Sequence, residues 1–385
     1  GHAGAILDVA VSGNGLYAAS GSADEFLRSD NNDEVDRTVR VWDIASGLEV
    51  QRFSLNAGYV RAIAFNSDNR SVIAGTWTSD LGGRIVSWDI RTGRTNYTLY
   101  GHSDIITDLA FQPNSDILLS VSWDRTLRIW DTVTGVELDR FEHFNDRILG
   151  ISISDDGQYA AIATGNIGND EINKDNENSA DTSVWLEDLR ERSEVRRFLS
   201  SRDWVWSMDI SNNGQFAVSG AGALRGESED NDVRMWNVNT GELIRRFEGH
   251  TGTVEGVEIS PDGSTVLSGA WDGFVILWDA NTGEEIRRFG PESRSHEGNV
   301  TSVAYHPDGE RAASSANDGS LILWNIATGE VIRRFEGHSA GINKIVFNAQ
   351  GNLIASASDD QTIRLWDVAS GDQIQLFDGP ENRAN

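Results

Sequence analysis

Residues 249–289 read GHTGTVEGVEISPDGSTVLSGAWDGFVILWDANTGEEIRRF, and this stretch contains every element of a unit that recurs along the chain. Four short runs rich in apolar residues lie at 254–259, 265–270, 274–278 and 285–289. Residues that favour tight turns separate them, at Ser260 to Gly263, Asp272-Gly273 and Asn281 to Gly283. Runs bounded in this way are typical of antiparallel strands. We therefore predict a four-stranded antiparallel sheet for each unit.

The third predicted strand of every unit ends on a tryptophan. These residues are Trp42, Trp88, Trp130, Trp185, Trp236, Trp278, Trp324 and Trp366, with successive spacings of 46, 42, 55, 51, 42, 46 and 42 residues. A repeat of this length indicates a propeller or a solenoid, because one such unit cannot bury both of its apolar faces without neighbours. Closing eight units into a ring covers both ends of the stack, so a propeller is favoured.

Two dipeptides mark the start and the end of the units. Three units open on Gly-His and close on Trp-Asp: Gly101-His102 with Trp130-Asp131, Gly249-His250 with Trp278-Asp279, and Gly337-His338 with Trp366-Asp367. With these marks the chain resembles the WD-repeat (beta-transducin-like) β-propeller family over essentially its whole length. The resemblance implies an all-β fold, an eight-bladed propeller with four antiparallel strands per blade and with blades that are contiguous in sequence.

The resemblance also implies a hydrogen-bonded structural set in each blade, made of a histidine, a strand serine or threonine, an aspartate in the second turn and the tryptophan. The matching residues are His2, Asp36 and Trp42; His102, Asp124 and Trp130; His250, Asp272 and Trp278; His296, Asp318 and Trp324; and His338, Asp360 and Trp366. Three units depart from the pattern. Asn56 and Ser201 stand at the histidine position of units two and five, and unit four reads Trp185-Leu186.

We predict a single propeller domain over residues 1–385. Its blades span approximately residues 1–54, 55–100, 101–142, 143–199, 200–248, 249–290, 291–336 and 337–379. Because the chain starts at Gly1-His2, within the repeat pattern, we expect it to be a piece of a longer protein. Since each blade draws its strands from one segment, we expect the ring to close by packing between the faces of blades one and eight.

Acidic residues outnumber basic ones, with 60 Asp and Glu against 32 Lys and Arg and a formal net charge of −28. Such a charge repels nucleic acids and anionic membranes and favours a basic protein or peptide as the partner. The alternative is that the acidity serves solubility or adaptation to salt. The absence of cysteine excludes disulfides and thiolate metal sites. With no long apolar run and no signal-like segment, we expect a cytoplasmic protein whose isolated domain is monomeric.

The acidic insertions between the second and third strands of units one, four and five offer the only plausible metal ligands. Asn173, Asp175 and Glu177 alternate as Ca²⁺ ligands can, but the glycine and the closing glutamate of an EF-hand loop are missing. A propeller that binds a cation or a small ligand through these insertions is therefore the alternative function, and a solvated loop is the alternative for the segment. We predict no other cofactor.

Five of the 13 tryptophans are left over by the blade signature: Trp77, Trp123, Trp204, Trp206 and Trp271. Trp77, Trp123 and Trp271 share one repeat position directly before the second turn, and Trp204 stands at the start of a first strand. In the resembled family both positions face the side where partners dock. Tryptophan, tyrosine and arginine also commonly dominate the energy of binding surfaces.

We therefore predict an aromatic rim that binds a partner. Its residues are Trp77, Trp123, Trp271, Trp204, Tyr59, Ile105, Arg147 and Arg202. The alternative is that these aromatic side chains only cap the blade ends against water. Trp206, which lies inside a predicted strand, is expected in the core or in the lining of the channel.

An Arg-Arg-Phe motif recurs on four consecutive outer strands, at 196–198, 245–247, 287–289 and 333–335. Charges on an outermost strand discourage edge-to-edge aggregation, and a basic belt that binds an acidic segment is the alternative.

Catalysis has little support in the sequence, which contains no nucleophile elbow, phosphate loop or His-Glu-x-x-His motif. First-strand carboxylates near the channel could form a glycosidase-like pair, namely Asp8, Asp108, Asp209 and Glu258. Acids are so frequent here that this coincidence carries no weight. We predict a non-catalytic scaffold or sensor module for protein–protein interaction, with the aromatic rim as anchor and the acidic loops as a steering field.

Overall fold

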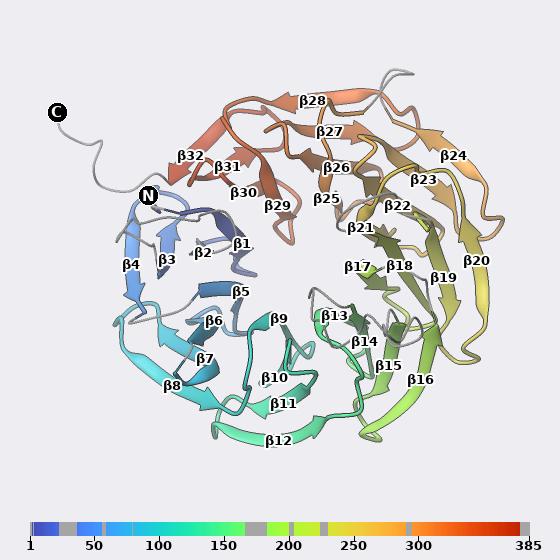
Figure 1. The fold of residues 1–385 in the computed structure, drawn as a ribbon. Coiled ribbons are helices and arrows are strands. Elements are labelled where there is room, and N and C mark those ends of the chain that lie inside the picture. The colour runs from blue at the N-terminus through green and yellow to red at the C-terminus, as the bar shows by residue number, and fades with distance from the viewer. Residues whose placement is uncertain are drawn as a thin grey trace.

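The computed structural model describes residues 2, 4–22, 37–55, 59–78, 80–165, 183–199, 204–223, 230–289 and 295–377. These residues form eight four-stranded antiparallel sheets arranged as the blades of a ring (Figure 1). The predicted all-β, eight-bladed propeller with contiguous blades is confirmed, because each sheet uses four strands that are consecutive in the chain. Within the described ranges, no helix is long and apolar enough to cross a membrane.

The first four blades have these strands. Blade 1 contains β1 (Ile6–Val11), β2 (Tyr17–Ser22), β3 (Thr38–Asp43) and β4 (Glu49–Ser54). Blade 2 contains β5 (Tyr59–Phe65), β6 (Ser71–Thr78), β7 (Gly82–Asp89) and β8 (Thr95–Tyr100). Blade 3 contains β9 (Ile106–Phe111), β10 (Ile117–Ser122), β11 (Leu127–Asp131) and β12 (Val136–Phe141). Blade 4 contains β13 (Ile148–Ile153), β14 (Tyr159–Thr164), β15 (Ser183–Asp188) and β16 (Ser193–Leu199).

The remaining blades repeat the arrangement. Blade 5 contains β17 (Trp204–Ile210), β18 (Phe216–Gly222), β19 (Val233–Asn237) and β20 (Leu243–Phe247). Blade 6 contains β21 (Val254–Ile259), β22 (Thr265–Ala270), β23 (Val275–Asp279) and β24 (Glu285–Arg288). Blade 7 contains β25 (Val300–Tyr305), β26 (Arg311–Ala316), β27 (Leu321–Asn325) and β28 (Val331–Phe335). Blade 8 contains β29 (Ile342–Phe347), β30 (Leu353–Ser358), β31 (Ile363–Asp367) and β32 (Gln373–Phe377).

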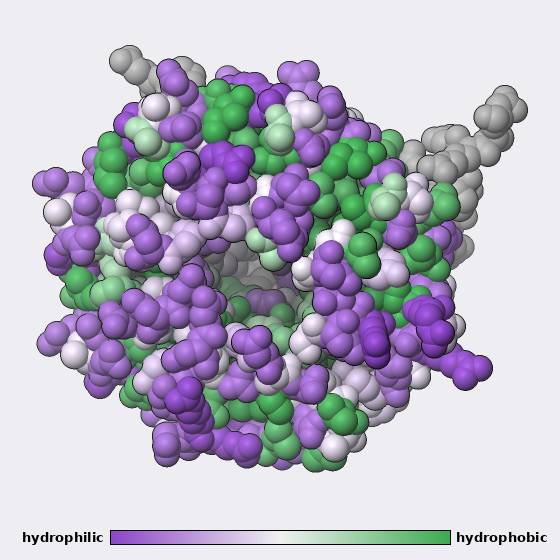
Figure 2. Space-filling model, turned by 180° about the vertical axis from the view of Figure 1, so that it is seen from behind, coloured by the Kyte–Doolittle hydropathy of each residue, from purple (hydrophilic) through white to green (hydrophobic). Residues whose placement is uncertain are grey.

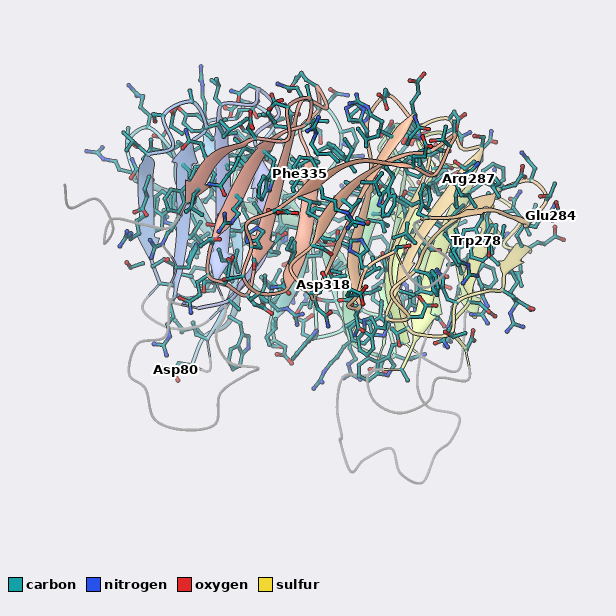
Figure 3. All side chains as sticks on the ribbon, turned by 90° about the horizontal axis from the view of Figure 1, so that it is seen from above. Asp80, Trp278, Glu284, Arg287, Asp318 and Phe335 are labelled. Carbon is teal, nitrogen blue, oxygen red and sulfur yellow. The ribbon has the colours of Figure 1, made fainter. Side chains whose placement is uncertain are left out.

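The first strand of each blade lies innermost and the fourth lies at the outer edge of the ring (Figure 1). Seen from behind, the ring is hollowed at its centre, and hydrophilic side chains surround the hollow (Figure 2). The antiparallel order places the turns between second and third strands at one end of every sheet. Asp80 and Asp318, which belong to two of these turns, lie on the same side of the ring (Figure 3). We call this side the front face.

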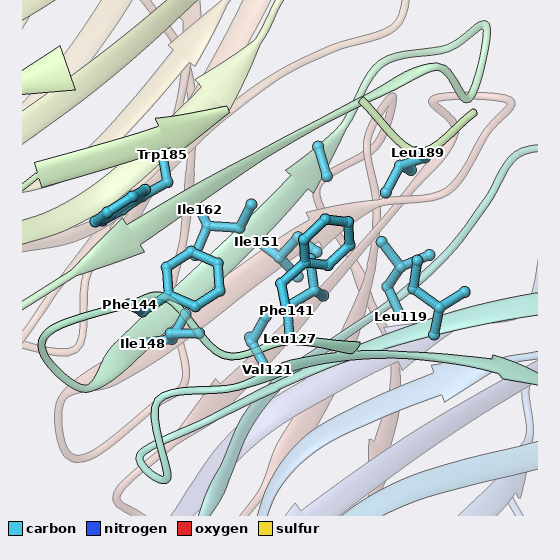
Figure 4. Close-up of a cluster of buried hydrophobic side chains, with 12 residues drawn as sticks. Leu119, Val121, Leu127, Phe141, Phe144, Ile148, Ile151, Ile162, Trp185 and Leu189 are labelled. Carbon is cyan, nitrogen blue, oxygen red and sulfur yellow. The ribbon is translucent and has the colours of Figure 1, made fainter. Parts of the chain in front are cut away.

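Apolar side chains fill every junction between neighbouring blades. At the junction of blades 3 and 4, Leu119, Leu127 and Phe141 pack against Ile148 and Trp185 (Figure 4). A comparable cluster lies at each of the other seven junctions among the described residues. This arrangement accounts for the apolar second and third strands, whose two faces are both covered.

Blades 8 and 1 close the ring by the same face packing, as expected from the sequence. Trp42 and Phe377 lie with ring centroids 5.0 Å apart within a shared apolar cluster. On the channel side, Lys344 Nζ contacts Asp8 Oδ1 at 2.6 Å, and Asn343 Nδ2 donates to the carbonyl of Ile6 at 3.0 Å. The junction therefore combines apolar contact, an ion pair and a hydrogen bond without exchanging strands between blades.

The first arginine of each Arg-Arg-Phe motif links its blade to the next one, a role that neither predicted alternative included. The pairs are Arg196 Nη2 with Asn239 O (3.2 Å), Arg245 Nε with Asn281 O (2.8 Å), Arg287 Nη1 with Thr328 O (2.8 Å) and Arg333 Nη2 with Ala369 O (2.8 Å). A glycine in the contacted turn leaves room for the side chain: Gly371 has φ +80°, and a Cβ there would lie 2.1 Å from Arg333 Cδ. These guanidinium groups already donate hydrogen bonds within the ring. Fewer of their N–H groups are therefore available to bind an external acidic segment.

Replacing Phe377 by alanine is expected to destabilise the protein by about 3–5 kcal/mol, because the side chain is 0% exposed at the closing junction. Chemical denaturation followed by tryptophan fluorescence measures the change. Phe335→Ala removes the equivalent side chain between blades 7 and 8 and is the matched comparison. Closure by face packing predicts similar losses, and a neutral Phe377→Ala beside a costly Phe335→Ala would contradict it.

Candidate partner-binding surface

The five tryptophans outside the blade signature differ from the other eight in exposure. The signature tryptophans are between 0% and 6% exposed. Trp77, Trp123, Trp204, Trp206 and Trp271 are all partly exposed. These five residues therefore contribute to the molecular surface, as a partner-binding role requires.

Backbone hydrogen bonds position the turn tryptophans on the front face. Trp123 N–H donates to the carbonyl of Ile105 at 2.9 Å, and Trp271 N–H donates to that of Thr253 at 2.8 Å. In blade 2 the corresponding residues Tyr59 and Trp77 pair in register. The residue before the second turn of a blade is thus held beside the residue before its first strand.

A β-bulge recurs near the start of the first strand in every blade. The residues that the pairing with the second strand skips are Leu7, Arg61, Thr107, Leu149, Trp206, Glu255, Thr301 and Asn343. We call these the bulge residues. Bulges redirect a side chain out of the regular alternation, and Thr107 Oγ1 donates to the carbonyl of Ile148 at 2.9 Å in the next blade. The bulge residues thus place eight side chains of six types at equivalent positions around the ring.

Three indoles form a continuous cluster across blades 5 and 6. The ring centroids of Trp204 and Trp206 are 5.4 Å apart, and those of Trp206 and Trp271 are 5.9 Å apart. Trp206 Nε1 donates to the carbonyl of Gly222 at 2.9 Å, which orients the central indole. We call Trp204, Trp206 and Trp271 the indole cluster. Trp206 was expected in the core or in the lining of the channel. It is partly exposed, so it does not belong to the core, and its indole lies beside those of Trp204 and Trp271.

Trp123 lies in a different environment, between two arginines. The guanidinium carbon of Arg147 lies 4.9 Å from the indole centroid and that of Arg61 lies 5.5 Å from it. Burial lowers the pKa of Arg61, whose charge is held in this partly desolvated position. The predicted rim is therefore not a uniform band of aromatic side chains. It contains one purely aromatic cluster and one stack of arginine and tryptophan.

Glu255 lies beside the indole cluster. Trp271 Nε1 donates a hydrogen bond to Glu255 Oε2. Burial raises the pKa of this carboxyl to about 7, although the hydrogen bond from Trp271 opposes the shift. Glu255 and Arg61 were not predicted from the sequence, since a bulge is not visible in strand periodicity. The repeat alignment carries the signal, because both residues occupy the position of Trp206.

The other predicted rim residues have mixed placements. Ile105 is 6% exposed, so it offers little area to a partner, and its carbonyl accepts the backbone N–H of Trp123. Arg202 lies outside the described residues, as does the side chain of Tyr59. Trp77 stands in blade 2 at the repeat position of Trp123 and Trp271.

The predicted hydrogen-bonded sets hold the front-face turns in place. In blade 6, His250 Nε2 lies 2.8 Å from Ser268 Oγ, which also accepts from Trp278 Nε1 at 2.8 Å, while His250 Nδ1 lies 3.0 Å from Asp272 Oδ2. Blades 3 and 8 repeat the arrangement around His102 and His338. Burial alone would raise the pKa of Asp124, but the hydrogen bond and the charge of His102 hold it at about 2.

The set of blade 7 differs in detail, and that of blade 1 is described in part. His296 Nδ1 contacts Ser320 Oγ rather than Asp318, and Ser320 Oγ donates in turn to Asp318 Oδ1. The serine therefore links the histidine to the aspartate in blade 7. In blade 1, His2 Nε2 lies 2.8 Å from Ser20 Oγ, which accepts from Trp42 Nε1 at 3.3 Å. Asp36 lies outside the described residues.

Blade 4 replaces the polar set by aromatic contacts, in agreement with its irregular sequence. Phe144 stands at the histidine position, and its ring lies edge-on to Trp185 with centroids 5.3 Å apart. Among the described residues, Trp185 Nε1 has no hydrogen-bond partner. His143 Nε2 contacts Glu187 Oε1 at 2.8 Å, and burial raises the pKa of Glu187 to about 8.

The first-strand carboxylates join blades to one another. Asp8 Oδ2 accepts from the backbone N–H of Ile63 at 2.7 Å, and Asp108 Oδ2 accepts from that of Ile151 at 3.1 Å. Asp209 Oδ2 and Glu258 Oε2 make the same kind of contact with Ile259 N–H (2.9 Å) and Tyr305 N–H (2.6 Å). Each acceptor is in one blade and each donor in the next. The carboxylates therefore have a structural role in joining neighbouring blades. This role accounts for their positions without glycosidase-like chemistry.

No group of three or more His, Asp or Glu side chains that could hold a metal ion occurs among the described residues. The candidate Ca²⁺ ligands Asn173, Asp175 and Glu177 lie outside them. Calcium binding by this insertion stays a prediction.

Comparison with known proteins places the repeats in a family context. The family model "WD domain, G-beta repeat" matches residues 1–43, 93–131, 192–237, 241–279, 286–325 and 329–367. The unmatched stretches contain most of blades 2 and 4, two of the three units that depart from the signature. The crystal structure of the computationally designed Ika8 protein superposes with a TM-score of 0.73 and 25% sequence identity, covering 96% of this chain and 98% of that one.

Two curated relatives share part of the chain. Autophagy-related protein 16 of Arabidopsis thaliana is 23% identical over 238 residues, which cover 62% of this chain and 33% of the relative. MST50-interacting protein 11 of Pyricularia oryzae is 25% identical over 221 residues, which cover 56% of this chain and 63% of the relative. The matches thus span from a third to less than two thirds of the length of these relatives.

The free energy of unfolding is expected to fall as pH rises from about 5 to about 8. Burial raises the pKa of Asp209 to about 6 and, with the charge of Asp209, that of Glu258 to about 8. Because the folded state holds these protons more tightly than the unfolded state, their stabilisation is complete below the unfolded pKa and is lost as pH rises through the folded values. Glu258→Gln, measured by denaturation across this pH range, is expected to flatten the slope. The exposed control Glu284→Gln is expected to leave it unchanged, and parallel slopes for wild type and Glu258→Gln would contradict the assignment.

Proposed function

Because the chain belongs to the WD-repeat β-propeller family, we propose that it is a non-catalytic scaffold or sensor module for protein–protein interaction. The partner contacts the front face, where the aromatic rim provides the anchor. One observation carries the proposal: eight tryptophans are buried as blade signatures, whereas the remaining five are all partly exposed around the blade starts and turns. Tryptophan is costly to leave in contact with water, and partly exposed indoles on a rigid frame are typical centres of binding energy.

Two further observations support a protein partner. The net charge of −28 favours a basic partner by electrostatic steering, and the acidic insertions of blades 1, 4 and 5 add to this field. One relative, MST50-interacting protein 11, carries in its name an interaction with another protein. We propose a cytoplasmic module that binds a basic protein or peptide and is monomeric by itself.

Replacing Trp77, Trp123, Trp204 and Trp271 together by alanine is expected to weaken binding of the partner at least about thirtyfold, because the loss of one anchor residue alone costs about 2 kcal/mol or more. Affinity capture identifies the partner, and calorimetry with the purified partner measures the loss. The matched control replaces four exposed apolar residues of the outer strands by serine: Leu243, Ile286, Ile332 and Ile374. Thermal unfolding shows whether both variants are folded. Retained affinity in the tryptophan variant, or an equal loss in the control, would reject the rim.

A further inference from the structure

Blades 3 and 6 present the same local frame around a tryptophan. Trp123 and Trp271 occupy one repeat position, before the second turn of their blades. In blade 3, Trp123 contacts the bulge residue of the preceding blade, Arg61, and the residue before the first strand of the following blade, Arg147. An indole at this position therefore packs against two guanidinium groups supplied by the chain itself.

The corresponding positions around Trp271 carry no arginine. The bulge residue of the preceding blade is Trp206, whose ring centroid lies 5.9 Å from that of Trp271. The residue before the first strand of the following blade is Asn299. Blade 6 thus keeps the indole and lacks the cations that cover its counterpart.

A carboxylate of the same blade lies beside Trp271. Glu255, the bulge residue of blade 6, accepts a hydrogen bond from Trp271 Nε1 through Oε2, whereas the bulge residue of blade 3 is the neutral Thr107. Among the described residues this is the one hydrogen bond that the carboxylate accepts, and burial and this bond account for its shifted pKa with no contribution from a charged side chain.

Two buried carboxylates of the ring have cationic partners, whereas Asp209 and Glu258 accept backbone N–H groups of the next blade. Asp8 pairs with Lys344 at 2.6 Å, and Asp230 pairs with Arg234 at 2.6 Å. Buried acidic side chains are usually paired in this way, because burial without a counter-ion is costly. The carboxylate of Glu255 and the neighbouring indoles therefore offer a cation the contacts that the chain does not itself supply.

We propose that Glu255, Trp206 and Trp271 bind the guanidinium group of an arginine side chain presented by a partner peptide. The carboxylate accepts its N–H groups and an indole face stacks on its plane. Arginine suits the site better than lysine because a planar guanidinium can stack on an indole and donate to a carboxylate at once. The guanidinium groups of Arg61 and Arg147 over Trp123 show the first of these contacts within the chain. This proposal rests on the proposed function, since it names the group that the front face recognises.

The proposal is tested by the binding of the peptide Ac-Gly-Arg-Gly-NH₂ to the whole chain. Indole fluorescence and ligand-observed NMR measure this binding. Matched peptides carry citrulline, which keeps the shape and loses the charge, or lysine. The arginine peptide is expected to bind about tenfold or more tightly than either one. Because the carboxylate must be ionised, affinity is expected to rise about tenfold between pH 6 and pH 8.

Three variants locate the site. Glu255→Gln keeps the shape of the side chain and is expected to lose about tenfold or more in affinity. Glu284→Gln removes an exposed charge from a turn of the same blade and is expected to bind as the wild type does. Trp206→Arg places a guanidinium at the position that Arg61 occupies beside Trp123, and it is expected to fill the site from within and to block the peptide. Thermal unfolding confirms that each variant is folded.

Equal affinity for the arginine and citrulline peptides, unchanged affinity in Glu255→Gln, or preference for the lysine peptide would overturn the proposal. The outcome separates from that of the proposed function. If the four-tryptophan variant loses its protein partner while Glu255→Gln binds the arginine peptide as before, the aromatic rim is supported and the guanidinium site is rejected. If Glu255→Gln loses the peptide while the rim variant keeps its partner, the site binds arginine and the partner docks elsewhere.

Discussion

The structure depends on the packing of each blade against two neighbours. A four-stranded sheet with two apolar faces cannot be stable alone, and each face is covered only when another blade presses against it. The described residues meet this requirement at eight junctions, including the closing junction where Trp42 meets Phe377. Because no strand is exchanged between the ends of the chain, closure depends on the same side-chain contacts as every other junction.

Polar links reinforce this packing near the axis and at the outer edge of the ring. Near the axis, carboxylates such as Asp8 and Glu258 accept backbone N–H groups of the next blade. At the outer edge, the guanidinium groups of Arg287 and Arg333 donate to carbonyls of the next blade. A rigid frame of this kind holds side chains at its front face in constant positions. Binding to such a surface requires little ordering of the protein, which lowers the entropic cost of association.

The repeat position explains why part of the site could be predicted and part could not. Trp123 and Trp271 were found because their spacing from the turns is constant, and turn residues can be recognised in the sequence. Arg61, Glu255 and the contacts of Trp206 with its neighbouring indoles were not predicted, because a bulge interrupts the alternation of the first strand and bulges leave no periodic signal. Ile105 was predicted at the surface, but the structure buries it.

The sequence by itself determined the blade number, the strand order and the buried tryptophans. These features depend on local turn chemistry and on a spacing of turns and tryptophans that recurs in the units. Only the tertiary structure decided which side chains meet across the junctions. Trp123 is packed against arginines and Trp271 against an indole and a carboxylate, although the two residues occupy the same repeat position. The physical reason is that each blade end is completed by residues of its neighbours, so its environment depends on contacts between segments that lie far apart in the chain.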